Sequence, residues 1–265
     1  MNIRLLCRND LNELMRLKEA AGWNQTEEDW LRLLRLQPEG CIGVEEDGRI
    51  VASTTVICYG SDLAWIGMVL TLPDYRGRGH ARRLMERALQ FAGQRTVRLD
   101  ASDMGLPLYA SLGFREECLV ERWSREAAPH RASERRLAFR PDYDMDREVF
   151  GAARTRLLQE LALYEGGSIR DRAYALGRPG SNATYLGPCV SETPGLAREL
   201  FSWFISHHSS ERIYLDLFPS NGNAVRLAQE FGFKAERRLT RMVLPASRET
   251  PPDPRIYAIA GFEYG

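Results

Sequence analysis

The sequence predicts an α/β fold that is used twice in tandem, and three observations lead to this prediction. Segments of the first half recur in order in the second half, stretches typical of strands and helices alternate, and a glycine-rich turn joins an apolar strand to a helix. The chain has 265 residues, long enough for two domains of ordinary size, and its 44% hydrophobic and 27% charged residues are typical of a globular protein.

The internal repeat is visible as a constant spacing between similar segments. Three segments recur: 97–100 as 213–216, 79–84 as 195–200, and 112–114 as 231–233. The first two pairs share an offset of 116 and the third has an offset of 119, so the second copy carries extra residues near 218–223. Because all three matches fall in order, we expect one domain over residues 1–128 and a second over residues 136–265. The stretch 125–134, with Pro129 and little apolar content, is the expected linker.

The first copy has the periodicity of alternating strands and helices. The expected helices are residues 10–18, 26–36, 78–91 and 106–112, and the expected strands are residues 41–45, 50–59, 64–72, 96–100 and 115–123. Asp47 and Gly48 form a strong hairpin signal between two of these strands, and Gly113 ends the last helix. Each half is therefore expected to be a sheet flanked by helices.

Composition excludes several classes of function. The 36 basic and 36 acidic residues balance, so no bulk attraction to nucleic acid or to a membrane is expected. The five cysteines are scattered without a C-x-x-C pair, and no run of about eighteen apolar residues is present. These features predict a cytoplasmic protein. His207 and His208 have no further ligands at metal spacing, so no metal is expected.

The most informative local feature is the turn Arg76-Gly77-Arg78-Gly79-His80-Ala81, between a strand and a helix start. Free backbone N–H groups at a helix start and flexible glycines together make an anion site. Taken alone the motif leaves three readings open: a phosphate site, an ordinary turn, or a short contact with RNA. A nicotinamide-dinucleotide site is excluded, because Arg82 stands at the third glycine of G-x-G-x-x-G.

This turn resembles the acyl-CoA signature R/Q-x-x-G-x-G/A of the GNAT superfamily of N-acetyltransferases, matched by Arg76, Gly79 and Ala81. Residues 67–73 resemble the fourth strand of that family, and residues 107–114 (PLYASLGF) resemble its LYxxxGF segment. The duplication, together with residues 185–188 and 261–265, resembles a subgroup with a degenerate second acetyltransferase-like domain. The resemblance implies a mixed, largely antiparallel sheet in each half, with splayed strands.

The resemblance also implies how acetyl-CoA would bind. The fourth strand splays from the fifth, and the pantetheine arm lies in the gap against the backbone of Val69, Leu70 and Thr71. An N–H of Val69 or Leu70 would polarise the thioester carbonyl, which gives Leu70 a catalytic role. The pyrophosphate would be held by the turn and first helical turn, to which the resemblance assigns Arg76, Gly77, Arg78, Gly79, His80, Ala81 and Arg82.

Tyr109 matches the tyrosine that protonates the departing thiolate in the family, and it is also assigned to cofactor contact. Its phenol and a thiol have similar intrinsic pKa values, so the proton transfer is expected to cost little. Without the family context, Tyr109 is a partly buried aromatic on an amphipathic helix. The sequence departs from the family at Ser102, where an asparagine is usual, although the matching position of the second copy is Asn221.

The acceptor site is expected across the splayed strands, roofed by residues 23–30 and by residues 59–65. Asp100, at the end of a strand, is the candidate general base. Weaker candidates are Glu27, Glu28, Asp29 and Asp62, and each of these acids could equally be a capping or solvated residue.

The second copy lacks what the chemistry needs. Arg76 corresponds to Glu192, Gly77 to Thr193, Arg78 to Pro194 and Tyr109 to Ala228. We therefore expect the second half to keep the fold without binding acetyl-CoA. It could cover the open face of the first half, add acceptor-site residues or mediate a homodimer.

The sequence thus predicts an N-acetyltransferase that moves an acetyl group from acetyl-CoA to a primary amine by direct attack in a ternary complex. A small-molecule amine is expected rather than a protein, with no nucleic-acid or membrane partner. The alternative is a non-catalytic sensor or assembly module that binds acyl-CoA.

Overall fold

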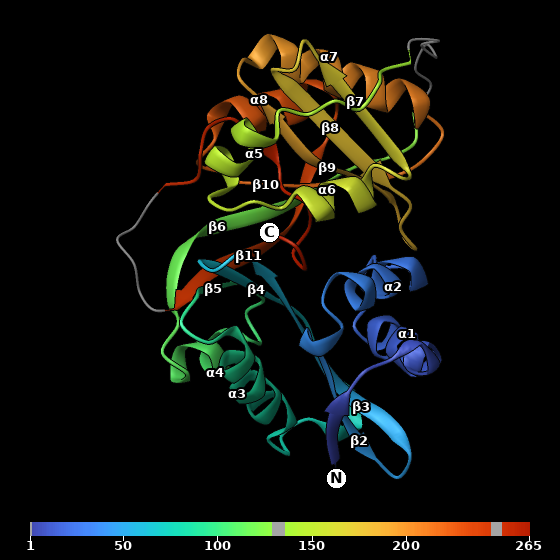
Figure 1. Ribbon diagram of the computed structural model, residues 1–265. Coiled ribbons are helices and arrows are strands. Elements are labelled where there is room, and N and C mark those ends of the chain that lie inside the picture. Colours follow the sequence, from blue (N-terminus) through green and yellow to red (C-terminus); the bar gives the residue numbers. More distant parts are fainter. Residues whose placement is uncertain (1, 129–135, 245–250) are drawn as a thin grey trace.

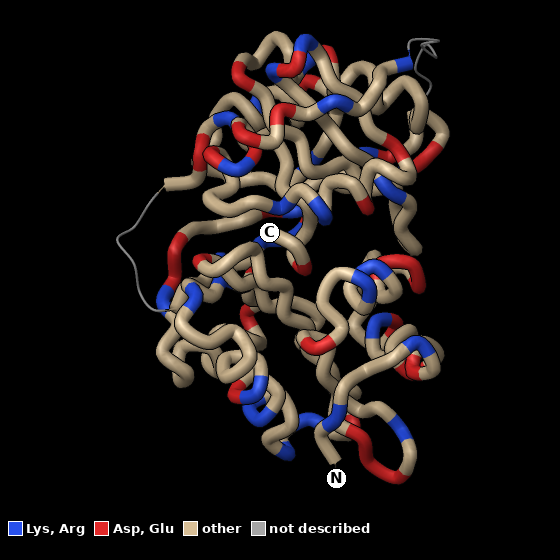
Figure 2. Tube along the Cα trace, viewed as in Figure 1, with Lys and Arg blue, Asp and Glu red and all other residues tan. Residues whose placement is uncertain are grey.

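Two α/β halves share one continuous twelve-stranded sheet in the computed structural model, which describes residues 2–128, 136–244 and 251–265 (Figure 1). The strands follow the order β1-β2-β3-β4-β5-β11-β6-β10-β9-β8-β7, and β12 pairs with β9 beside this path. Basic and acidic residues alternate over both halves (Figure 2), as the zero net charge suggests. Among the described helices, none combines the length and apolar character needed to cross a bilayer.

The elements of the first half lie close to the expected ranges. Its strands are β1 (Asn2–Leu5), β2 (Cys41–Glu46), β3 (Arg49–Tyr59), β4 (Leu63–Thr71), β5 (Thr96–Ala101) and β6 (Arg115–Arg125). Its helices are α1 (Leu11–Ala20), α2 (Glu27–Leu36), α3 (His80–Ala92) and α4 (Leu106–Ser111), with 3-10 turns at Arg8–Asp10, Pro38–Gly40 and Pro73–Tyr75. Thr26 caps α2 in a reciprocal box with Asp29, and Asp47 and Gly48 form the β2–β3 turn at positive φ.

The second half repeats this arrangement. Its strands are β7 (Glu165–Ile169), β8 (Ala173–Arg178), β9 (Thr184–Ser191), β10 (Ile213–Leu217), β11 (Lys234–Leu244) and β12 (Ile256–Ala258). Its helices are α5 (Tyr143–Phe150), α6 (Thr155–Leu161), α7 (Pro194–His207) and α8 (Gly222–Glu230). The expected linker is only partly described, since β6 continues to Arg125 and residues 129–134 lie outside the described residues.

Alternating side chains of β4 enter different clusters on the two faces of the first-half sheet. Trp65, Met68 and Leu70 join the cluster built with α1 and α2, whereas Ala64 and Ile66 join the cluster built with α3. Figure 1 shows these two helical layers on opposite sides of the sheet. The alternation changes phase between Ile66 and Met68, where the pairing of β3 with β4 shifts register. On either side of that point a slip of one residue would exchange the two faces.

β6 of the first half and β11 of the second half are each inserted into the sheet of the other half. β11 lies between β5 and β6, and β6 lies between β11 and β10, with antiparallel pairing at all three contacts. Among the described strands, β6 therefore pairs with strands of the second half alone. The predicted domain boundary at residue 128 stays a prediction, but neither half completes its sheet without a strand from the other.

Two buried ion pairs hold the exchanged strands in place. They are equivalent in the repeat, because Asp100 corresponds to Asp216 at the offset of 116 and Arg122 to Arg241 at the offset of 119. Arg122 of β6 donates two hydrogen bonds to Asp216 of β10, both at 2.8 Å. Arg241 of β11 donates to Asp100 of β5 at 2.8 and 3.0 Å. Each arginine also lies over aromatic rings, Arg122 over Phe262 at 4.7 Å and Arg241 over Trp65 at 4.4 Å. Bidentate geometry and ring stacking are what allow an arginine to be buried.

The segment after β11 returns to the first half. This return segment, residues 256–265, pairs with β9 through β12 and then crosses to β4 and α2. The Tyr59 hydroxyl donates to the Tyr264 carbonyl at 2.8 Å, and the Trp65 indole donates to the Phe262 carbonyl at 2.9 Å. Residues 59–65, expected to cover the acceptor site, therefore bind the return segment.

Replacing Asp216 with Asn should lower the free energy of unfolding by about 3 kcal/mol, because it leaves the Arg122 guanidinium buried without an anionic partner. Urea denaturation followed by circular dichroism measures this. The exposed pair Arg198–Glu230 supplies the control, and Glu230→Gln should leave the free energy of unfolding essentially unchanged, because water screens this pair. Equal effects from both variants would contradict the role given to the buried pair.

Candidate active site

A deep cleft opens where β4 and β5 part. The two strands pair in parallel only over Leu63–Trp65 and Thr96–Arg98, and then diverge as the family resemblance implied. The cleft has a volume of about 1020 Å³ and is bordered by residues 69–71 at the end of β4 and by residues 102–105, which follow β5. It is lined by most of the predicted cofactor residues: Val69, Leu70, Thr71, Arg76, Gly77, Gly79, His80, Ala81, Arg82 and Tyr109. The tertiary structure thus gathers these residues around one space.

The glycine turn has the geometry of an anion cradle. Gly77 and Gly79 adopt φ values of +74° and +79°, and a Cβ atom at either position would meet no atom within 4 Å. The positive φ values therefore favour glycine at both positions, while the space around each Cβ position is open to a ligand. Gly79 occupies the N-cap position of α3 without a side-chain cap, so the first N–H groups of the helix have no capping side chain.

The side chains of the cradle divide into two groups. Arg82 lies at the cleft and donates to the Ser111 hydroxyl at 2.6 Å, and Arg76 donates to the Thr71 carbonyl at 3.3 Å. His80 is buried, with Nε2 at 3.3 Å from Glu46 Oε1. Arg78 does not line the cleft; it donates to the Asp74 carbonyl and stacks on Tyr75. The predicted contact of Arg78 with the cofactor therefore has the least geometric support.

A bulge in β4 turns the backbone that follows it toward the cleft. Met68 adopts a φ of +50°, and the pairing with β3 shifts register at this point. The Ser53 hydroxyl donates to the Met68 carbonyl at 2.8 Å and holds the bulge. Val69 and Leu70, the predicted donors to the thioester carbonyl, follow directly and border the cleft. A bulge beside a cleft is a common way to turn backbone groups toward a ligand.

Tyr109 lies on α4 at the junction of this cleft and a second, smaller pocket. It is 7% exposed, and burial raises the pKa of its phenol. The expectation of near-matched pKa values for this phenol and a thiol in water thus needs correction. A buried phenol keeps its proton at neutral pH and transfers it readily only to a thiolate that is itself desolvated.

Asp100 is not free to act as a simple base. Both of its carboxylate oxygens accept from Arg241, its side chain is fully buried, and burial raises its pKa. Asp216 makes the same bidentate pair with Arg122 in the second half. This repetition in both halves favours a structural role for Asp100, and its catalytic assignment stays a prediction.

The smaller pocket, about 60 Å³, adjoins Tyr109 and combines both halves of the chain. The first half supplies Trp23, as expected for the roof, and also Gln25 and residues 66–69 of β4. The second half and the exchanged strands add residues that sequence reasoning did not assign to a site: Arg122, Arg237, Leu239, Phe262 and Glu263. Residues 261–265 resemble the family subgroup, but the sequence around Glu263 does not indicate where its side chain is buried.

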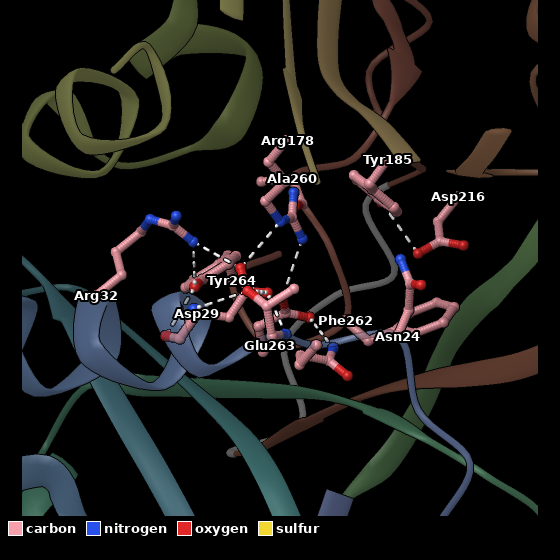
Figure 3. Close-up of polar contacts among 12 residues, drawn as sticks. Asn24, Asp29, Arg32, Arg178, Tyr185, Asp216, Ala260, Phe262, Glu263 and Tyr264 are labelled. Atoms are coloured by element: carbon pink, nitrogen blue, oxygen red, sulfur yellow. Dashed lines mark hydrogen bonds and ion pairs between the residues drawn. The ribbon is translucent and has the colours of Figure 1, made fainter. Parts of the chain in front are cut away.

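Glu263 is held by a row of alternating buried charges (Figure 3). Arg32 donates to Asp29 at 2.6 Å, Arg178 lies 3.2 Å from the same carboxylate, and Arg178 donates to Glu263 at 2.9 Å. Gln25 donates to the other Glu263 oxygen at 2.9 Å. Burial raises the pKa of Glu263, while Arg178 acts in the opposite direction. Asp29, a weaker candidate base, is thus committed to Arg32 and Arg178.

The corresponding cradle of the second half is closed by its own side chains. Thr193 caps α7 by accepting from the Leu196 N–H, and Pro194 has no N–H to offer. Glu192 pairs with Arg172 at the same place. An anion would meet a capped helix and a carboxylate here, which agrees with the expected loss of cofactor binding.

The wedge of the second half is filled by the chain itself. β9 and β10 pair only at Thr184–Ile213 and Tyr185–Tyr214, and β12 then pairs with β9. The Ile259 N–H donates to the Asp216 carbonyl on the β10 side. Asn221, at the position of the family's asparagine, donates to the carbonyls of Pro254 and Ile256 at 2.9 and 2.8 Å. β12 therefore lies where a pantetheine arm would lie in the first half.

The described residues contain no cluster of three or more histidine, cysteine, aspartate or glutamate side chains arranged to bind a metal ion.

Comparison with protein families separates the chain into the same two halves. Residues 7–114 match the model described as "Acetyltransferase (GNAT) family", and residues 143–258 match the model described as "Acetyltransferase (GNAT) domain". The chain belongs to the GNAT acetyltransferase family. It carries two GNAT domains in tandem, and the resemblance seen in the sequence is confirmed.

Two curated relatives are similar over part of the chain. The uncharacterized N-acetyltransferase YitH of Bacillus subtilis is 30% identical over 158 residues, which are 56% of this chain and 55% of the relative. The UPF0039 protein C11D3.02c of Schizosaccharomyces pombe is 33% identical over 75 residues, covering 26% of this chain and 50% of the relative. The chain spans about half the length of the curated relatives it matches.

Solved structures share the fold over the whole chain. A protein of Pyrococcus horikoshii superposes with a TM-score of 0.84 at 21% identity, covering 100% of this chain and 95% of its own. A GCN5-related N-acetyltransferase of Sphaerobacter thermophilus gives 0.66 at 18% identity over 91% and 94%. A tandem GNAT protein from the clavulanic acid biosynthesis pathway gives 0.64 at 15% identity over 93% and 99%. The predicted tandem fold is confirmed.

Gly67 tests whether the return segment is seated against β4. A Cβ at this position would come within 2.8 Å of the Glu263 Cα, a backbone atom that cannot rotate away. We expect Gly67→Ala to lower the free energy of unfolding by about 1–3 kcal/mol and to alter the fluorescence of Trp65, which binds the Phe262 carbonyl.

Gly195→Ala is the matched control for this variant. Gly195 lies in the first turn of α7, and an added Cβ would have its nearest neighbour at 4.0 Å. The control should leave stability unchanged or raise it, because alanine favours a helix over glycine. If Gly67→Ala behaved like Gly195→Ala, the return segment would not be packed on β4.

Proposed function

We propose that the protein is an N-acetyltransferase that moves an acetyl group from acetyl-CoA to a primary amine, with its active site in the first half. The observation that carries this proposal is the cleft itself. One space of about 1020 Å³ runs from the uncapped start of α3, along the parted β4 and β5, to Tyr109. The start of α3 suits a diphosphate, the parted strands suit an extended arm, and the surroundings of Tyr109 suit a thioester, in the order that these groups have in acetyl-CoA.

The residues present fit acetyl-CoA at both ends. At one end, the open backbone of Gly77 and Gly79 and the guanidinium of Arg82 suit a pyrophosphate. At the other end, the bulged backbone after Met68 suits the pantetheine amides and the thioester carbonyl. Acetyl-CoA supplies an activated acetyl group when bound, and the chain supplies position, amide donors and a proton.

The residues around the thioester position divide the work of the transfer. An N–H of Val69 or Leu70 stabilises the negative charge that develops on the carbonyl oxygen during attack. Tyr109 keeps its proton because burial raises its pKa, and it gives that proton to the departing sulfur. Direct attack by the amine requires both substrates at once, so the chain works through a ternary complex.

One acetyl-CoA is expected to bind per chain. The second half has Thr193 and Pro194 at its helix start and β12 in its wedge, so neither the diphosphate nor the arm has room there. We assign the second half to completing the acceptor pocket, one of the three roles that the sequence left open. The pocket volume of about 60 Å³ under the return segment suits a small or slender amine rather than a folded protein surface.

Gly77→Ala should weaken acetyl-CoA binding by about tenfold or more, since the new methyl group would occupy the space needed for close approach of a phosphate. Isothermal titration calorimetry measures the affinity, and the wild type should bind one acetyl-CoA per chain. Arg76→Glu, which reverses a charge at the cleft, should act in the same direction.

Gly48→Ala provides a control with the same backbone strain. Gly48 also has a φ of +74° and open space around its Cβ position, but it lies in the β2–β3 turn away from the cleft. The two variants should lose similar stability, about 1 kcal/mol each, while only Gly77→Ala loses affinity. Equal affinities, with Arg76→Glu also unchanged, would refute the cradle.

Tyr109→Phe should lower kcat by about 100-fold or more while leaving acetyl-CoA affinity within about twofold, because the ring is kept and only the proton donor is lost. Release of CoA thiol in the presence of primary amines measures turnover. A protein that binds acetyl-CoA but acetylates none of the amines would instead be the acyl-CoA sensor of the alternative reading.

A further inference from the structure

Gln25 and Glu263 form a buried polar pair beside Tyr109. They are 6% and 2% exposed, and both line the small pocket. The Gln25 amide nitrogen donates to a Glu263 oxygen at 2.9 Å, which fixes the orientation of the amide. Gln25 Oε1 is consequently left without a hydrogen-bond partner among the described residues. Buried side-chain oxygens are rarely unpaired, so this one points to a missing donor.

This pair lies close to where the thioester carbonyl would be. Glu263 packs its backbone directly on Gly67, two residues before Val69 in β4. Val69 and Tyr109 line both the small pocket and the large cleft, so the two spaces meet at them. A group bound by Gln25 and Glu263 would therefore approach the thioester from the side opposite the cofactor.

Resting on the proposed function, we propose that Gln25 and Glu263 receive the ammonium group of the acceptor, and that Glu263 takes its proton. An ammonium group has three N–H donors and no acceptor. Glu263 accepts one hydrogen bond at each carboxylate oxygen, from Arg178 and from Gln25, and each oxygen keeps a second lone pair. Glu263 lines the pocket and Gln25 Oε1 is free, so the pocket presents two acceptors to one cation. The return segment of the degenerate half thus supplies the base to the active half.

The transfer balances with these groups. Glu263 accepts one proton from the acceptor ammonium, and the neutral nitrogen attacks the thioester carbon. The C–N bond forms and the C–S bond breaks, and the sulfur receives the phenolic proton of Tyr109. The second proton lost by the nitrogen restores the Tyr109 phenol, and the proton on Glu263 leaves to solvent with the product. The net products are an amide, a free thiol and one proton.

The surroundings of Glu263 strengthen it as a proton acceptor. Burial raises its pKa, whereas the Arg178 guanidinium and the Gln25 amide limit the rise. Charged or titratable groups face it from each packed element: Arg178 of β8, Asp29 of α2, Arg122 of β6, Tyr59 of β3, Tyr185 of β9 and Tyr264 of the return segment. A carboxylate whose pKa lies above its ordinary range is a better proton acceptor than a surface glutamate.

The test compares Glu263→Gln with the wild type on paired acceptors. Phenethylamine, pentylamine and spermidine serve as alkylamine probes, and each amine R–CH₂–NH₂ that is acetylated is paired with its aminooxy counterpart R–O–NH₂. Aminooxy nitrogens are already unprotonated at neutral pH and need no base. We expect Glu263→Gln to lower kcat for the alkylamine by about 100-fold and for the aminooxy analogue by less than about fivefold.

The pH profile gives a second readout. In the wild type, kcat for the alkylamine should fall as the pH is lowered through the raised pKa of Glu263, because a protonated carboxyl cannot accept the proton. Glu263→Gln should remove this acidic limb. A merely structural role for Glu263 would lower the rate without changing the shape of the profile.

Asp146→Asn is the matched control. Asp146 is as buried as Glu263 and pairs with Arg154, which also donates to the Gly265 carbonyl of the return segment, but it does not line the small pocket. This variant should lose stability and keep the ratio of alkylamine to aminooxy turnover. Thermal unfolding and acetyl-CoA affinity establish that both variants are folded and loaded.

The outcomes separate the two proposals. If the wild type acetylates none of the probes, the proposed function fails and this inference fails with it. If the wild type is active and Glu263→Gln slows both acceptors equally, or changes neither, the inference alone is overturned. Selective loss of the alkylamine reaction supports it.

Discussion

The fold depends on the reciprocal exchange of one strand between two halves, and on the buried charges that fix it. Arg122 reaches Asp216 and Arg241 reaches Asp100, so each half carries an arginine whose anionic partner lies in the other half. Either residue alone would be costly to bury, and both pairs are satisfied only when β6 and β11 lie side by side. The two GNAT domains therefore share one sheet.

This exchange gives the second half a part in the pocket of the first half. β6, β11 and the return segment bring Arg122, Arg237 and Glu263 to the first-half pocket. Arg237 and Glu263 are each more than a hundred residues from Val69 in the sequence. The return segment makes two sets of contacts in sequence. Its β12 fills the wedge of the second half, and its next residues pack on Gly67 and Trp65 of the first.

The two halves differ in how the first helix after the cleft strand is capped at its N-terminus. In the first half, Gly79 leaves the first amides of α3 uncapped and open to the cleft. In the second half, Thr193 caps α7 and Pro194 removes an amide. The same helix dipole is thus offered to a ligand in one half and satisfied internally in the other. The packing residues that both halves share, such as Leu84 and Leu200, are unaffected by this difference and remain fully buried.

The sequence by itself determined the local features: helix and strand positions, the β2–β3 turn, the duplication, and the glycine turn before α3. These depend on side-chain periodicity and on φ values that glycine alone adopts easily, and both are properties of short segments. The tertiary structure alone decided the pairing of Asp100 with Arg241, the exchange of β6 and β11, and the place of Glu263 in the pocket. Those depend on contacts between residues far apart in the chain, 94 positions for Arg122 with Asp216 and 238 for Gln25 with Glu263. No local pattern specifies which distant partner a buried charge will meet.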